Sequence, residues 1–168
     1  MSAAVPARAS AAVWRLAVPS NVAVAGVRMA GFSGRATQSV DMRVVPYPAV
    51  TVFVEFGDGT LIDETAGREL RHGGIVGPLP GGLRACGREV DCLQIRLSPP
   101  LARRVFGDVS ELTATVTAFD EVWGRDAEAL RERLHAARDW EARFAIAADA
   151  LVRRRDAGPL VDAEVAFA

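Results

Sequence analysis

The stretch VDCLQIRLSPPLARRVFG, residues 90–107, changes its hydrophobic period in the middle. Residues 90–97 alternate loosely between apolar and polar side chains, as a half-buried strand does. Two prolines follow. Proline cannot donate a hydrogen bond to a strand ladder but suits the first turn of a helix. The sequence therefore predicts that the chain leaves a sheet here and continues as a short helix over residues 99–106.

The residues before this junction have the pattern of a β-protein. Short apolar runs between residues 13 and 97 are interrupted by Gly, Pro and Asp. The sequence Gly57-Asp58-Gly59 predicts a hairpin between strands at 49–56 and 60–63. Further corners are expected at the glycine pairs 73–74 and 81–82. Because closure removes exposed strand edges, residues 13–97 favour a small barrel or sandwich.

The residues after the double proline show helical periodicity. A second helical piece is expected near residues 110–123, followed by two longer helices that Asp126 and Asp139 cap. The last helix ends at Gly158-Pro159. Strands first and helices afterwards is the order of an α+β protein, here with a helical region over residues 98–157.

The last predicted helix carries an apolar stripe that has two possible partners. Its members are Trp140, Phe144, Ala147 and Leu151. They can cover the sheet of their own chain, or they can pair with the same helix of a second copy. Because two long helices follow one modest barrel, we expect one helix to pack inward and this stripe to form the interface of a homodimer.

Composition and charge exclude several classes of protein. Half of the 168 residues are apolar and the formal net charge is −1, which is typical of one globular domain and argues against a free-standing nucleic-acid binder. No apolar run approaches the roughly 20 residues of a membrane-spanning helix. Residues 1–12 are small and featureless; we expect a disordered tail, not a secretory leader. A cytoplasmic protein whose Cys86 and Cys92 remain unpaired is expected.

Catalytic and metal-binding patterns are not evident. The two histidines, His72 in a glycine-flanked turn and His135 on a predicted helix, do not form a metal-ligand pair. Neither a nucleophile motif nor a phosphate-binding loop is present. We therefore expect no metal, no cofactor and no enzymatic activity.

Alternation within two predicted strands identifies candidate binding residues. Val50, Val52, Val54 and Phe56 form the core face of residues 49–56, while Thr51, Phe53 and Glu55 lie on the other face. In residues 90–97, Gln94 and Arg96 share the face opposite the core. These second faces either contact solvent, which is the simpler interpretation, or line a polar cavity. For the cavity, the predicted lining residues are Phe53, Glu55, Gln94 and Arg96, with Arg28 and Tyr47 behind them.

The order and spacing of several motifs resemble those of a known family. DCLQIRLSPPLARRVFG, then SELTATVTAFDEVWG, then two amphipathic helices are similar to the N-terminal sensor domains of AraC-type bacterial transcriptional regulators. VVPYPAVTVFVEFGD matches an earlier strand pair of that family, so the resemblance spans about residues 26–168. The matching positions are Ile95, Arg96, Pro99, Leu101, Phe106, Gly107, Glu111, Leu112, Val116, Phe119, Trp123 and Gly124. The sequence departs from the family at Pro99-Pro100-Leu101, where Pro-Gly-Gly is usual.

The resemblance implies a specific architecture and function. It implies a cupin-like β-barrel that binds a small-molecule effector, helices that dimerise, and control of a C-terminal helix-turn-helix domain. DNA would be contacted only through that domain, which lies outside this sequence, and residues 158–168 are expected to be the linker to it. The alternative is a stand-alone cupin-like binding or dimerisation protein.

Overall fold

The computed structural model describes residues 15–21, 24–45, 47–77 and 82–158. The predicted tail and all of the predicted linker except Gly158 lie outside these residues. The strands are β1 (Arg15–Ala17), β2 (Val27–Arg43), β3 (Val50–Glu55), β4 (Thr60–Asp63), β5 (Arg68–Leu70), β6 (Gly73–Val76), β7 (Leu83–Leu97) and β8 (Val116–Ala118). The helices are α1 (Pro99–Phe106), α2 (Phe119–Trp123), α3 (Ala127–Ala136) and α4 (Trp140–Ala157), with a 3₁₀ turn η1 (Val109–Leu112). The predicted α+β class is confirmed.

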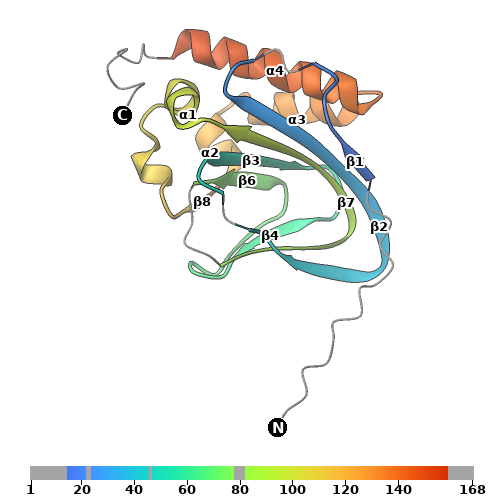
Figure 1. The fold of residues 1–168 in the computed structure, drawn as a ribbon. Helices are drawn as coiled ribbons and strands as arrows, with labels where there is room; N and C mark the ends of the chain where they lie inside the picture. The colour runs from blue at the N-terminus through green and yellow to red at the C-terminus, as the bar shows by residue number, and fades with distance from the viewer. Residues whose placement is uncertain (1–14, 22–23, 46, 78–81, 159–168) are drawn as a thin grey trace.

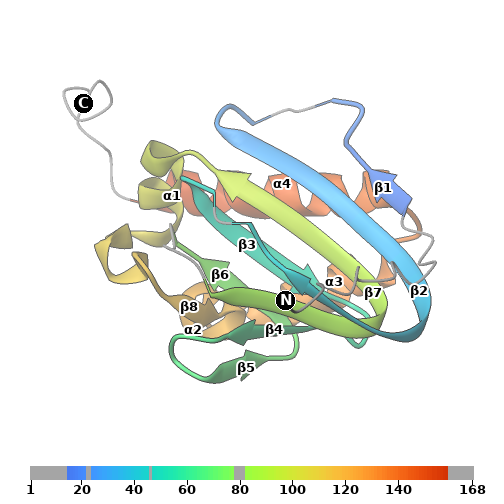
Figure 2. The ribbon, with the colours of Figure 1, turned by 60° about the horizontal axis from the view of Figure 1, so that its bottom comes forward.

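The strands form one antiparallel sheet that curls but does not close. Its order is β1-β2-β7-β3-β6-β8, and β4 pairs with both β5 and β7. Figure 1 shows α3 and α4 on one side of the sheet and β4 on the opposite side, and Figure 2 shows the long, curved β2 and β7 from below. In the described part of the chain, β1 pairs only with β2 and β8 only with β6. The predicted closed barrel is therefore wrong: short strands end the sheet at both edges.

The two halves of β7 have different neighbours, which explains why the sheet curls. Residues 92–97 of β7 pair with β3, whereas residues 83–86 pair with β4. Between Arg35 and Val40, the pairing of β2 with β7 shifts register. Irregularities of this kind bend strands and increase their twist. The far halves of β2 and β7 therefore turn away from the helices.

The Gly57-Asp58-Gly59 turn does not join two paired strands, so the hairpin prediction is wrong. β3 pairs with β6 and β7, and β4 pairs with β5 and β7. The turn instead leads from β3, which pairs with one half of β7, to β4, which pairs with the other half. The carboxylate of Asp58 accepts hydrogen bonds from the backbone N–H of Arg88 (2.9 Å) and Glu89 (2.7 Å), between these halves. Sequence signals indicated a tight turn but not the partner of each strand.

The region after the double proline is less helical than predicted. Residues 110–123 contain the end of η1, strand β8 and the short helix α2, and β8 pairs with β6. The β-branched run Thr115-Val116-Thr117 favours this strand. The other helices are confirmed. Asp139 caps α4, where its carboxylate accepts a hydrogen bond from the N–H of Ala142 at 2.8 Å, whereas Asp126 precedes α3 without a side-chain capping bond.

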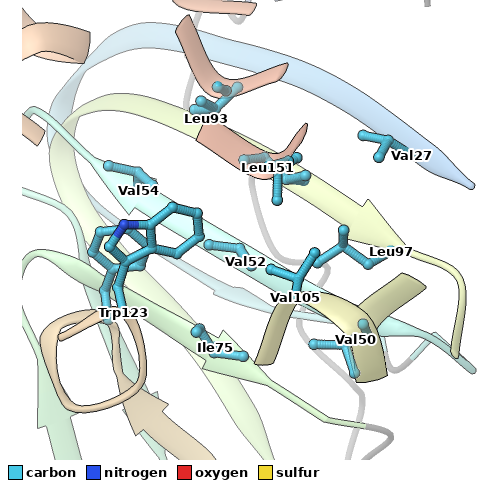
Figure 3. Close-up of a cluster of buried hydrophobic side chains, with 14 of the residues drawn as sticks. Val27, Val50, Val52, Val54, Ile75, Leu93, Leu97, Val105, Trp123 and Leu151 are labelled. Carbon is cyan, nitrogen blue, oxygen red and sulfur yellow. The ribbon is translucent and has the colours of Figure 1, made fainter. Parts of the chain in front are cut away.

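The main hydrophobic core lies between the sheet and the helices (Figure 3). It contains the apolar face of β3, the apolar face of β7 and the inward faces of α1, α3 and α4. Its most buried large side chains are Val52, Val54, Ile75, Leu93, Leu97, Leu134 and Leu151. Within α4, Phe144, Ala147 and Leu151 all belong to this core. The apolar stripe of α4 therefore covers the sheet of its own chain.

The junction at residues 98–100 folds the chain back over the end of the sheet. The N–H of Ser98 bonds to the carbonyl of Gly26 at 2.8 Å, and α1 begins at Pro99. α1 and α2 end at Gly107 and Gly124, whose φ angles of 81° and 83° suit glycine. The double proline thus directs α1 onto the edge of the helical layer.

Arg154 of α4 joins the ends of α1 and α2. Its guanidinium donates hydrogen bonds to the carbonyls of Val105 (3.2 Å), Trp123 (2.6 Å) and Val122 (3.4 Å) and lies 4.6 Å from the Trp123 ring. The ring of Phe106 contacts Trp123 edge-on, with 6.1 Å between centroids. The two motifs that end in Phe-Gly and Trp-Gly therefore meet in space around one arginine.

No helix among the described residues is long and apolar enough to cross a membrane.

The position of Leu151 predicts that α4 is a structural element of the core. Leu151 is 1% exposed, and Leu151→Ala is expected to lower the free energy of unfolding by about 2–5 kcal/mol, because it removes apolar contacts and leaves a cavity. Urea unfolding followed by circular dichroism measures this change. Leu16→Ala is the matched control, since Leu16 is 66% exposed. A small loss of stability together with altered sedimentation would instead place Leu151 at an interface between copies.

Candidate functional site

A pocket of about 400 Å³ lies on the concave side of the sheet, opposite the helices. Strands β2, β3, β4 and β7 contribute most of its lining. Its walls are predominantly apolar. The lining residues are Arg15, Leu16, Phe32, Val40, Met42, Val44, Phe53, Glu55, Gly59, Thr60, Leu61, Gly73, Ala85, Cys86, Gly87, Val90, Cys92 and Gln94. Pockets of this size and character are typical of small-molecule sites.

Three of the six predicted binding residues line this pocket. They are Phe53, Glu55 and Gln94. Phe53 and Glu55 are each 8% exposed, so the interpretation of this strand face as a solvent face is wrong. The curled sheet covers it instead. Ligand binding by these residues stays a prediction.

The other three predicted residues lie elsewhere. Arg96 and Tyr47 line a narrow space of about 20 Å³ that shares Phe53 and Gln94 with the main pocket. There the guanidinium of Arg96 lies 4.4 Å from the centre of the Tyr47 ring. Arg28 is opposite Arg96 in the β2–β7 ladder, but it is exposed and lines neither space.

Several pocket residues were not predicted. Cys92 is the ladder partner of both Glu55 and Phe32, so these three side chains share one face of the sheet. Met42 and Leu61 enter the pocket from the far halves of the curl. The sequence shows the alternation of side chains within each strand. Which side chains from different strands come together in the pocket depends on the register between the strands.

Glu55 places a carboxylate at one end of this apolar pocket. Its Oε1 accepts hydrogen bonds from the backbone N–H of Gly57 (2.9 Å) and Asp91 (3.0 Å). Its Oε2 lies against Gly59, where a Cβ atom would approach to 2.5 Å. Burial raises the pKa of Glu55; its two backbone hydrogen bonds oppose this effect, and the negative charges of Asp91 and Asp58 add to it.

Cys92 lies beside Glu55 and remains a protonated thiol. Burial raises the pKa of Cys92 well above its usual range, and the adjacent Glu55 carboxylate raises it further. A thiol of this kind is a poor nucleophile, because the thiolate is the reactive form. Cys86, also in the pocket lining, is likewise free, so the prediction of unpaired cysteines is confirmed. The chemistry around Glu55 therefore suits binding better than nucleophilic catalysis.

Asp91 connects the pocket to the helical layer. Its N–H bonds to Glu55, while its carboxylate forms a two-point ion pair with Arg143 of α4, at 2.6 Å and 3.1 Å. Arg143 also donates to the carbonyl of Leu134 at 3.1 Å and lies between the rings of Phe56 and Trp140. One residue of β7 thus contacts the pocket through its backbone and α4 through its side chain.

The four predicted dimer-interface residues lie on α4. Phe144, Ala147 and Leu151 are at most 4% exposed and face the sheet. Trp140 is half-buried, and its ring lies over Gly31 of β2 so closely that a Cβ there would overlap it. A dimer that used the three buried side chains would require α4 to leave the sheet. The homodimer stays a prediction.

Two other hollows are open and polar. One of about 340 Å³ lies between β2, β7 and α4 around Arg138 and Asp139, and one of about 680 Å³ lies between β5, α2 and α3. The latter is bordered by His72, which is exposed. His135 is exposed on α3, where its ring lies 6.0 Å from that of Phe56. Because charged, solvated side chains surround both hollows, the concave pocket is the stronger candidate.

Comparison with protein-family models and with curated proteins found no match.

The buried carboxylate predicts a specific pH dependence. Because the folded-state pKa of Glu55 is raised above its usual value of 4.5, ionisation of Glu55 costs the folded state stability. This cost is absent below the unfolded pKa, grows as pH rises through the folded pKa, and is then constant. Glu55→Gln removes it. The difference in unfolding free energy, Glu55→Gln minus parent, is therefore expected to increase with pH.

Urea unfolding at intervals between about pH 4 and pH 8 measures this difference. Glu89→Gln is the control, since Glu89 is exposed on the neighbouring strand β7 and pairs with Arg35 at 2.8 Å. A difference for Glu55→Gln that does not vary with pH would show that the carboxylate is as well solvated in the folded chain as in the unfolded one.

Proposed function

We propose that this chain is an effector-sensing domain that binds a small molecule on the concave side of its sheet. The observation that carries the proposal is the combination of a largely apolar pocket of about 400 Å³ with one buried carboxylate, Glu55, at its end. Apolar walls supply affinity, and a single polar group orients the ligand. In this proposal the curled sheet binds the effector, which is the role that the resemblance implied for a cupin-like barrel.

Signal transmission in this proposal depends on the helical layer. A ligand that contacts Glu55 alters the environment of the Asp91 N–H, and the side chain of Asp91 holds Arg143 of α4. Ligand binding would then favour one arrangement of α4 over another. Such coupling requires the ligand to bind the two arrangements with different affinities.

We further propose, from the resemblance to AraC-type sensor domains, that the domain forms a homodimer and controls an attached helix-turn-helix domain. The support is the order of the sequence motifs together with the packing of their ends, where Phe106, Trp123 and Arg154 meet. The alternative is a stand-alone binding or dimerisation protein. It retains the pocket but lacks the DNA-binding output.

Pocket occupancy predicts protection of the cysteines. Both cysteines of the chain line the pocket, so no other thiol contributes to the signal. The neutral dye N-phenylnaphthylamine is expected to gain fluorescence on binding and to slow alkylation of Cys86 by iodoacetamide, as followed by mass spectrometry. A Cys92→Phe variant, which places a large side chain in the pocket, should lose the dye signal while remaining folded. Dye binding that leaves Cys86 alkylation unchanged would place the dye elsewhere and count against the pocket.

The regulatory part of the proposal predicts the sequence of the native gene. The reading frame is expected to continue past the codon for Ala168 into two helix-turn-helix units. Sequencing the gene tests this directly. A stop codon at that point would remove the DNA-binding output from the proposal and make the stand-alone binding protein the better account.

A further inference from the structure

The acidic end of the pocket has no matching cation among the described residues. The ion pairs of the described chain do not include Glu55. The charged groups that act on it, Asp91 and Asp58, are acidic, and its neighbour Cys92 is neutral. A buried charge without a partner costs free energy. A cationic ligand that pairs with Glu55 would reduce this cost.

Two arginines line the pocket or the space beside it, and neither pairs with the carboxylate of Glu55. Arg15 lies on the edge strand β1, is exposed, and contributes to the lining. Arg96 lies in the adjoining narrow space, where its guanidinium stacks on Tyr47. Neither forms an ion pair with Glu55. Among the described residues, the carboxylate of Glu55 therefore has no ion-pair partner.

The rest of the pocket defines the body of the ligand. Phe32, Met42 and Leu61 supply apolar walls, and Leu16 at 66% exposure and Met42 at 40% exposure are large apolar side chains that remain accessible in the lining. Such a surface favours aliphatic or aromatic groups rather than sugars or phosphates. The ligand that fits has one charged head and an apolar remainder.

We propose that the pocket selects organic amines: an ammonium group that donates hydrogen bonds to the carboxylate of Glu55, carried on an apolar body that fills the space between β2, β4 and β7. This inference rests on the proposed function, because it specifies the ligand class of the same pocket. An anionic head would be repelled by the ionised carboxylate of Glu55, the one acidic residue in the pocket lining. A neutral hydroxyl would satisfy one hydrogen bond but leave the buried charge uncompensated.

The raised pKa of Glu55 supports this assignment, since an adjacent cation stabilises the ionised carboxylate and lowers that pKa. The bound ammonium group would therefore supply the positively charged partner that Glu55 lacks in the free protein. The preference for amines should weaken as the solution is acidified and Glu55 becomes protonated.

Three probes with one chain length test the inference: octylamine, octanol and octanoate, each titrated into the parent protein by calorimetry. The parent is expected to bind octylamine at least about tenfold more tightly than octanol, the value of one charge-assisted hydrogen bond, and octanoate most weakly. Glu55→Gln, which keeps the shape and the acceptor for Gly57 and Asp91, should bind octylamine and octanol equally. Glu89→Gln, an exposed control, should keep the preference.

The outcomes separate the two levels of the proposal. Equal binding of octylamine and octanol by the parent would overturn the amine assignment while leaving a binding pocket. Binding of none of the three probes would overturn the proposed function and the amine assignment together. Should Glu55→Gln fail to fold, the parent alone decides: the amine preference must diminish with decreasing pH, and a preference independent of pH would assign it to another group.

Discussion

Burial of β3 on both faces is the constraint on which the rest of the structure depends. All six of its residues are buried. The helices cover the face of Val50, Val52 and Val54, as ordinary core packing requires. The opposite face includes Phe53 and Glu55, and the sheet itself must cover it. The bent parts of β2 and β7, together with β4, provide this cover. The pocket exists because this second cover encloses the face without filling it.

Arginine chemistry fixes the helical layer in place. The chain contains no lysine, and two arginines of α4 each form several bonds to neighbouring elements. Arg143 joins α4 to β7 and α3, while Arg154 joins α4 to the ends of α1 and α2. Both stack on aromatic rings as they bond. A planar guanidinium with several fixed donors can do this, whereas a lysine ammonium provides a single point of attachment.

The parts of the structure that were predictable from the sequence depend on local signals. The strand at β3, the transition at Pro99 and the capping of α4 by Asp139 each follow from alternation, proline or a capping side chain. Strand partners depend on distant residues, so the hairpin at Gly57-Asp58-Gly59 and the closed barrel were predicted wrongly, and β8 was missed. The same limit applies to the pocket. Alternation identified Phe53, Glu55 and Gln94, but the inclusion of Cys92 and the exclusion of Arg28 follow from register and curvature.

In the proposed sensing mechanism, one hydrogen bond at β7 limits how strongly a ligand in the pocket can act on α4. Arg143 neutralises the carboxylate of Asp91 on the helical side, while Glu55 remains uncompensated on the pocket side, and one N–H links the two. A hydrogen bond to a carboxylate contributes about 1.5–3 kcal/mol, which corresponds to a change of about 10- to 150-fold in an equilibrium. A ligand acting through this link alone can thus shift α4 only between arrangements whose free energies differ by no more than this. Effective sensing would require the helical layer to be closely balanced before the ligand binds.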